Sequence, residues 1–308
     1  MRVIGDIVMP NWNQVLKELQ ECPRKDALDF IRRKYIKLLA EKTNRNIIAY
    51  YSGWLQKPGI IRSSINDDDK NGFMATIHGL DRSKGLDLIL HTPGGDMAAT
   101  ESIVDYLRRM FGDDIVCYIP QIAMSGGTMI ACSCKEIVMG KQSNIGHIDP
   151  QFGGIPAHGV IKEFETAIEA IKKDPESIPI WQKIVEKYHP TFLGECQNAI
   201  KLSEEMLYSW LISNMLVDDE KRDENANKIL KYLSDHSDRK THARHINIDE
   251  AKTIGLKIRD LESDNIVQDI VLTIHHSFMH TFSNSSAIKI IENNIDNAII
   301  SLSGTNQN

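Results

Sequence analysis

The sequence lacks a long apolar run, a signal peptide and a cysteine framework. No stretch reaches the roughly 18 uncharged apolar residues that a membrane helix needs, and the N-terminal segment has no continuous apolar core of the signal-peptide kind. The chain has only five cysteines, an odd number without regular spacing, which argues for free thiols in a reducing compartment. These absences predict a cytoplasmic protein with no integral membrane segment.

An excess of basic residues is also missing. The net charge is −6, and lysine and arginine are mixed with aspartate and glutamate along most of the chain. Neither nucleic acid nor an anionic membrane is therefore an expected partner. Hydrophobic residues make up 42% and charged residues 25% of the sequence, which is ordinary for a globular protein. With 308 residues, the chain can form one large domain with appendages.

Signatures of metals and cofactors are absent as well. Cys132 and Cys134 are separated by one residue, which is not a zinc spacing, and we expect them to be buried free thiols. His276 and His280 share a helix face, but the sequence has no HExxH pattern and no evident third ligand. It also has no dinucleotide-binding fingerprint. We therefore expect no metal and no cofactor.

The middle of the chain alternates between short apolar strands and helices. Strands are expected at Leu86–His91, Ile115–Ile119 and Glu136–Met139, with helices at Thr100–Met110 and Ser125–Cys134 between them. This order predicts a parallel α/β sheet with right-handed crossovers.

Outside this stretch the expected elements are mostly helical. Residues 11–43 have the periodicity of amphipathic helices, and helices dominate after Gly159, including one in the tail from Ile266 to Ile291. Ile47–Ser52 is a further short strand. The polar segment Gly59–Lys70, with three consecutive aspartates, is expected to be a solvated loop.

A proline–glycine turn follows the first strand of the alternation, in the sequence HTPGGD from His91 to Asp96. Pro93 fixes its own φ, and Gly94 and Gly95 give the backbone access to conformations that other residues avoid. Backbone N–H groups in such a turn can point into a cleft, and the following helix contributes positive partial charge. The turn could therefore hold an oxyanion or a phosphate.

Ser125 occupies a similar position after the next strand, in the sequence AMSGG. Its small neighbours leave the hydroxyl uncrowded, and the N–H of Gly126 could donate to an oxyanion, as at other nucleophilic serines that open a helix. Ser125 alone could be a simple helix cap. Two such turns side by side favour a serine nucleophile facing free N–H groups.

These two segments, LILHTPGGDMAATESIVDYLR and IPQIAMSGGTMIACSCKEIVMGKQSNIGHIDPQ, resemble the ClpP/crotonase superfamily. Within it, the chain is most similar to the signal-peptide-peptidase-like branch and its serine dehydrogenase proteinase family. The segments NIIAYYSGWLQ and HHSFMHTFSNSSAIKIIEN carry the likeness outward. The resemblance implies a ClpP/crotonase-like parallel-sheet core at residues 46–260, a helical extension at 1–45 and a helical tail at 261–308.

The resemblance also implies roles for individual residues. In the proteolytic branches the serine attacks a peptide carbonyl, which maps onto Ser125. The first glycine of the turn and the residue after the serine donate to the oxyanion, which maps onto Gly94 and Gly126. Removal of one such donor typically lowers the rate by about 100- to 1000-fold.

The proton acceptor stays open between two solutions found in the superfamily. ClpP-like enzymes use a histidine, which maps onto His147, oriented by a carboxylate for which Asp238 or the nearer Asp149 qualifies. Signal-peptide-peptidase-like enzymes use a lysine on a following helix, which maps onto Lys162. A lysine base requires burial to lower its pKa.

Three functions are therefore compatible with the sequence. The first is a serine peptidase acting on peptides or unfolded proteins, in a homo-oligomeric ring as the resemblance implies. The second is a crotonase-type acyl-CoA enzyme, which would need an acid in the pocket and a site for adenosine diphosphate. The third is a scaffold whose catalytic site has decayed.

Overall fold

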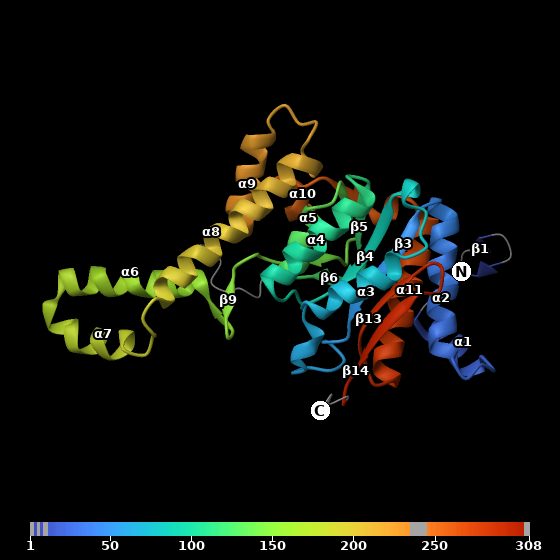
Figure 1. Cartoon of the computed structure of the whole chain (residues 1–308), viewed down its shortest axis with the longest axis horizontal. Coiled ribbons are helices and arrows are strands. Elements are labelled where there is room, and N and C mark those ends of the chain that lie inside the picture. The colour runs from blue at the N-terminus through green and yellow to red at the C-terminus, as the bar shows by residue number, and fades with distance from the viewer. Residues whose placement is uncertain (1–2, 5–6, 9–11, 235–244, 305–308) are drawn as a thin grey trace.

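The computed structural model describes residues 3–4, 7–8, 12–234 and 245–304. Its centre is a seven-stranded sheet in the order β12-β7-β5-β4-β3-β13-β14 (Figure 1). The strands are β3 (Asn46–Ser52), β4 (Leu86–His91), β5 (Ile115–Ile119), β7 (Glu136–Met139), β12 (Ile258–Asp260), β13 (Ala287–Asn293) and β14 (Ala298–Leu302). The five strands from β12 to β3 run parallel, and β13 and β14 are antiparallel to their neighbours. The expected parallel α/β core is confirmed.

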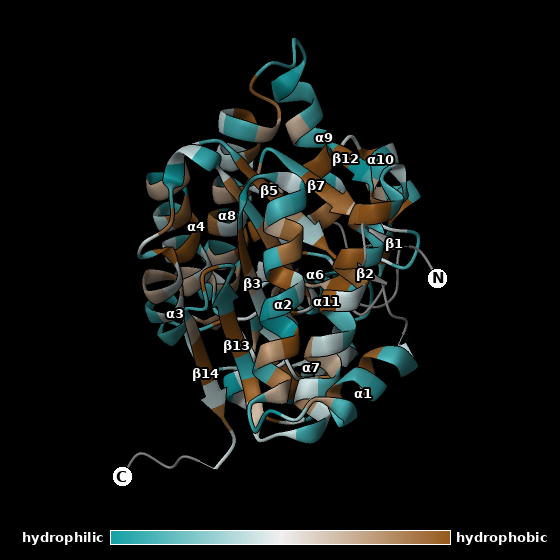
Figure 2. Cartoon of the chain, turned by 90° about the vertical axis from the view of Figure 1, so that its right-hand side faces the viewer, coloured by the Kyte–Doolittle hydropathy of each residue, from teal (hydrophilic) through white to brown (hydrophobic). Residues whose placement is uncertain are grey.

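The sheet is covered by helices on both faces, which explains why its strands are almost continuously apolar. Every residue of β3, β4 and β5 is buried. One face packs against α3 (Asp68–Ile77), α4 (Met97–Phe111), α5 (Gly126–Cys132), α9 (Arg222–Ser234) and α10 (Ile248–Ile254). The other packs against α2 (Ala27–Thr43) and α11 (Asn265–Asn284), which lie across the brown, hydrophobic strands in Figure 2. Helix α1 (Trp12–Glu21) lies against α11 and α2.

Two of the crossovers position the expected site. β4 leads through the glycine turn into α4, and β5 leads through the short strand β6 (Ile122–Ala123) into α5. Because β4 and β5 are parallel neighbours, the turns after them meet at one edge of the sheet. β6 belongs to a three-stranded sheet with β8 (Asn144–Ile145) and β11 (Ile246–Asn247).

An arm of helices projects from this core, to the left in Figure 1. It contains α6 (Ala157–Lys173), α7 (Ile178–Val185) and the first part of α8 (Phe192–Trp210), and a hairpin of β9 (Gln151–Phe152) and β10 (Ile155–Pro156) leads into it. The arm has a small apolar cluster of its own, built around Phe192 and Cys196. Helix α7 has no buried residue.

The tail departs from the helical expectation for Ile266–Ile291. The helix ends at Asn284, and Ala287–Asn293 then forms β13 inside the sheet, followed by β14. The isoleucines of β13 are β-branched and lie buried on both faces of the strand, an environment that favours a strand over a helix. The chain therefore returns to the sheet after α11, next to β3.

The expectation of a solvated loop at Gly59–Lys70 is also wrong in part. Helix α3 begins at Asp68, inside this segment. Asp69, the last of the three aspartates, is only 4% exposed, and its carboxylate pairs with Lys289 of β13. The neighbouring Asp67 and Asp68 are exposed, as expected.

Candidate active site

The glycine turn, residues 92–96, presses directly on the serine turn, residues 123–126. Gly94 has a φ of 90°, and a Cβ placed there would lie 2.5 Å from Met124 O and 2.8 Å from Ser125 Cβ. A parallel bridge between Thr92 and Ala123 holds the two turns together. No side chain larger than hydrogen fits at Gly94, so the two turns that the sequence predicts side by side are in contact.

Ser125 has a backbone conformation that non-glycine residues rarely adopt, with φ 48° and ψ −115°. It directly precedes α5 and remains partly exposed, while the glycines that follow it are buried. A sharp, strained strand-to-helix turn of this kind presents a serine hydroxyl at the mouth of a site. The Ser125 hydroxyl hydrogen-bonds to none of the residues that the structure describes.

Residues 64–66, which we call the strap, pack against the other side of the glycine turn. Ile65 donates its N–H to Gly94 O at 2.8 Å and accepts from Asp96 N at 2.9 Å, forming a parallel bridge around Gly95. In such a bridge the N–H of the middle residue points away from the partner strand. The N–H of Gly95 therefore faces the serine turn rather than the strap.

The backbone donors near Ser125 differ in their hydrogen bonding. Gly94 N donates to Thr92 Oγ1 at 3.2 Å. Gly95 N and Gly126 N have no acceptor among residues 12–234 and 245–304. They lie close together, since a Cβ on Gly126 would be 3.6 Å from Gly95 N. Two N–H groups without an acceptor in the described part of the chain thus lie close together beside the serine.

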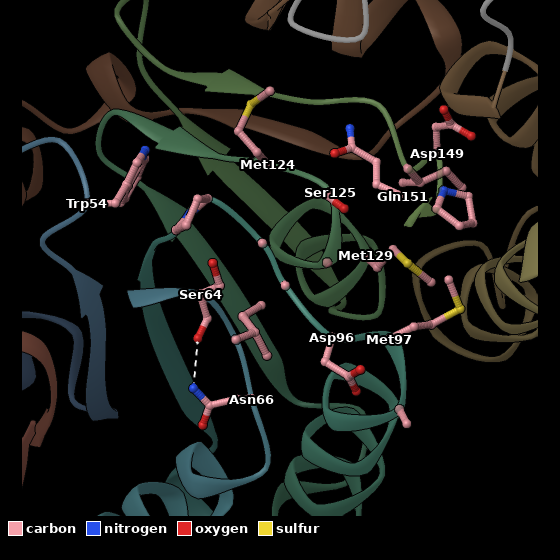
Figure 3. Close-up of a pocket in the computed structure, with 18 of the residues that line it drawn as sticks. Trp54, Ser64, Asn66, Asp96, Met97, Met124, Ser125, Met129, Asp149 and Gln151 are labelled. Carbon is pink, nitrogen blue, oxygen red and sulfur yellow. Dashed lines mark hydrogen bonds between the residues drawn. The ribbon is translucent and has the colours of Figure 1, made fainter. Parts of the chain in front are cut away.

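Ser125 opens into a large cleft, shown in Figure 3, with a volume of about 1410 Å³. This exceeds the size of a typical small-molecule pocket and leaves room for an extended chain of several residues. Met97, Met124 and Met129 form an apolar wall beside the serine, and Trp54 lines the cleft at the left of Figure 3. Arg62 is the one lysine or arginine that lines the cleft within the described residues.

Asp149 lies on the wall of the same cleft and is only 1% exposed. Burial raises the pKa of its carboxyl group to about 7, against a smaller lowering by the N–H of His158. Among the described titratable groups that line the cleft, Asp149 is the one whose pKa is shifted into the neutral range. Such a carboxyl is a candidate for proton transfer. From the sequence, Asp149 was expected only as a carboxylate that orients His147.

His147 follows β8 and precedes β9, is 2% exposed, and is not among the described residues that line the cleft. Its Nδ1 lies 3.1 Å from Leu233 O. A carbonyl oxygen only accepts, so Nδ1 carries a proton and Nε2 is the ring nitrogen that can act as a base. The preceding Gly146 packs on Met124, the neighbour of Ser125: a Cβ there would lie 3.3 Å from Met124 Cα.

The other two residues proposed for proton transfer lie elsewhere. Lys162 is on α6 in the arm, with its side chain 70% exposed and paired to Glu165 at 3.5 Å. It therefore lacks, within this chain, the burial that a lysine base requires. Asp238 lies outside the described residues.

A cluster of neutral histidines lies behind the glycine turn, on the face of the sheet that α2 and α11 cover. His91 is fully buried between Trp54 and His275, with ring centroids 4.4 and 5.3 Å away. Burial lowers the pKa of His91 well below its usual value and that of His275 to about 3. Within the described part of the chain, no group of three His, Cys, Asp or Glu side chains is placed to hold a metal ion.

The sheet, its crossovers and the paired turns define a ClpP-like α/β protein with a serine at the mouth of a cleft. Residues 19–281 match the family of ClpP-like SDH-type serine proteinases, and the chain belongs to that family.

Two relatives come from the archaeon Methanocaldococcus jannaschii. The uncharacterized protein MJ0137 is 29% identical over 236 residues, which are 75% of this chain and 74% of the relative. The uncharacterized protein MJ1495 is 30% identical over 194 residues, 63% of this chain and 59% of the relative. In the described residues, no helix is long and apolar enough to span a bilayer.

Proposed function

We propose that this protein is a serine peptidase in which Ser125 is the nucleophile. The observation that carries the proposal is the meeting of the strained Ser125 with two unsatisfied N–H groups, those of Gly95 and Gly126. The sequence led us to expect Gly94 and Gly126 as the donors. We propose Gly95 in place of Gly94, because the N–H of Gly94 is already bonded to Thr92. Family membership supports peptide hydrolysis over other acyl transfers.

In the proposed reaction His147 is the general base. Its Nε2 takes the proton from the Ser125 hydroxyl as Oγ attacks the carbonyl carbon of the substrate. Negative charge then develops on the carbonyl oxygen, where the N–H groups of Gly95 and Gly126 stabilise it. His147 next gives its proton to the leaving amine, and water releases the acyl group by the reverse sequence.

The contact between Ser125 and His147 forms in the substrate complex in this scheme, since catalytic hydrogen bonds often tighten only there. Asp149 lines the same cleft as Ser125 and is a carboxyl group that titrates near neutral pH. Lys162 would become the base only if another subunit buried it. The homo-oligomer and the cytoplasmic location expected from the sequence remain part of the proposal.

Labelling with a fluorophosphonate tests the nucleophile. We expect wild-type protein to be labelled at Ser125 and to hydrolyse an unstructured peptide, and Ser125→Ala to lose both. Peptidase activity that survives in Ser125→Ala would refute the proposal, as would wild-type protein that neither reacts nor hydrolyses.

The base is tested by comparing His147→Gln with Lys162→Met. Loss of a general base lowers kcat by about 100-fold or more, so His147→Gln should show this loss and Lys162→Met should keep wild-type kcat. The opposite pattern would assign the base to Lys162.

One observation favours the acyl-CoA alternative: Asp149 supplies the buried acid in the cleft that such an enzyme needs. The cleft offers little for adenosine diphosphate, since Arg62 is its one lysine or arginine in the described chain. A rise in melting temperature with acyl-CoA, and none with a peptide aldehyde, would support this second function.

A further inference from the structure

We propose that the buried ion pair between Lys289 and Asp69 is a positioning device, which holds the strap against the glycine turn and so aims the N–H of Gly95 at the reacting carbonyl oxygen. The inference rests on the proposed function of Ser125 and adds residues distant in the sequence, on β13 and α3. Neither side chain lines the cleft.

The pair is desolvated and its hydrogen bonds are fully used. Lys289 Nζ lies 2.7 and 2.9 Å from the two carboxylate oxygens of Asp69, and the side chains are 3% and 4% exposed. The third ammonium donor goes to Ser64 O at 2.6 Å. All three donors of the ammonium group therefore have acceptors, and one of them is the first residue of the strap.

Asp69 binds the other end of the strap. Its Oδ2 accepts from Asn66 N at 3.0 Å and from the Tyr50 hydroxyl at 2.8 Å. The ion pair thus fixes Ser64 through the lysine and Asn66 through the carboxylate. Between them, Ile65 has its N–H and C=O free to bond the glycine turn.

The strap in turn sets the position of the turn. Ile65 bonds Gly94 O and Asp96 N, and a Cβ on Gly95 would lie 2.3 Å from Ile65 O and 2.4 Å from Ile65 N. Backbone packed this closely cannot shift on one side alone. A change in the strap would therefore rotate the peptide between Gly94 and Gly95, whose N–H is the proposed donor.

A buried ion pair is weak support for stability alone, because an apolar pair of similar volume often serves equally well. A charged pair with fixed geometry can instead determine where neighbouring backbone lies. Lys289 and Asp69 also contact no atom expected to react, so their effect on catalysis would act entirely through the strap.

The double variant Lys289→Met/Asp69→Leu tests the device. A single substitution would leave one buried charge unpaired and disrupt folding, whereas the double variant removes both charges. The chain offers a matched control in Arg32→Met/Glu292→Leu. That pair is also buried, at 2.9 Å, and also starts from β13, but it lies on the face covered by α2 and α11, away from the turn.

We expect the Lys289/Asp69 variant to lower kcat by about 10- to 100-fold, approaching the loss of one oxyanion donor, with KM within about twofold. Amide exchange at Ile65 and Asp96 should accelerate at least about tenfold, while amides of β4 and β5 keep the protection seen in the control. The control should keep wild-type kcat and the wild-type exchange of the strap.

The readouts separate this inference from the proposed function. If wild-type protein is active and both double variants share the same kcat, the positioning role is overturned. If wild-type protein shows no Ser125-dependent activity, the proposed function fails, and exchange alone decides whether the pair holds the strap. Unchanged amide exchange at Ile65 and Asp96 in the Lys289/Asp69 variant would overturn the proposal that the ion pair holds the strap, whether or not the protein is active.

Discussion

At the scale of single residues, the site depends on backbone conformation more than on side chains. Ser125 holds a conformation with positive φ that costs on the order of 1–3 kcal/mol and persists only where the surroundings impose it. Here the surroundings are the glycine turn on one side and α5 on the other. The two proposed donors are also backbone groups. We therefore expect the site to be more sensitive to substitution of its glycines than to substitution of its polar side chains.

Gly95→Ala is the sharpest residue-scale test of this arrangement. The new methyl group would lie 2.3 Å from Ile65 O, so the turn must move, and we expect kcat/KM to fall at least about 100-fold. Steady-state kinetics on a peptide substrate measure the effect. Gly194→Ala is the control, because a Cβ there meets no atom within 4 Å on helix α8 and should preserve activity. Near wild-type rates in Gly95→Ala would exclude Gly95 as a donor.

Asp149 should make stability depend on pH. Its pKa is about 7 in the folded protein and near 3.9 when unfolded, so between these values the folded state binds more protons. With respect to this group, the folded state is therefore most stable below about pH 4. The contribution of Asp149 to the free energy of unfolding then declines by about 1.4 kcal/mol per pH unit up to about pH 7.

Urea unfolding of wild type and Asp149→Asn at several pH values measures this term. The free energy of unfolding of the wild type, minus that of the variant, should fall between pH 4 and 7 and level off above. A difference that stays flat, or rises with pH, would contradict a buried carboxyl with a raised pKa.

At the scale of elements, the sequence was sufficient where the pattern was local. β4 and β5 are short apolar runs bounded by glycine, proline or aspartate, and both were predicted within their observed bounds. β13 was not, because the apolar residues of Ile266–Ile291 fit a buried helix and a buried strand equally well. Its strand conformation is decided by pairing with β3, some 240 residues earlier in the chain.

The buried ion pair between Arg32 and Glu292 links three elements that are distant in the sequence, α2, α11 and β13. Arg32 of α2 is fully buried and bonds Glu292 of β13 at 2.9 Å and Thr281 of α11 at 3.0 Å. Replacement of Arg32 by Met would leave the buried Glu292 with only the longer contact to Arg33, at 3.8 Å, so we expect a loss of about 3–5 kcal/mol in the free energy of unfolding. Urea denaturation measures it. Lys183→Met, which removes an exposed pair with Glu186, should cost less than about 1 kcal/mol; equal losses would contradict this account.

At the scale of the whole molecule, the sequence predicted that the glycine turn and the serine turn would meet, because each follows a parallel strand of the same sheet. It could not predict the strap or its ion pair. Asp69 gave the signal of a solvated acidic run, and only the fold brings it to Lys289. The choice between Gly94 and Gly95 as donor depends on the bridge to Ile65, a contact with no local signature.

The arm carries the last expectation, that of a homo-oligomer. Helix α7 combines Ile178 and Ile180, 45% and 66% exposed, with no buried residue of its own. Exposed apolar side chains that lie together on one element can mark a protein–protein interaction site. We therefore expect light scattering to give a mass several times that of one chain, and Ile178→Glu/Ile180→Glu to reduce it while the core keeps its melting temperature. Met74→Glu, at an exposed position of α3, serves as the control and should leave the mass unchanged. A wild-type monomer, or an unchanged mass in the α7 variant, would remove the arm as the assembly surface, and with it the route by which another subunit could bury Lys162.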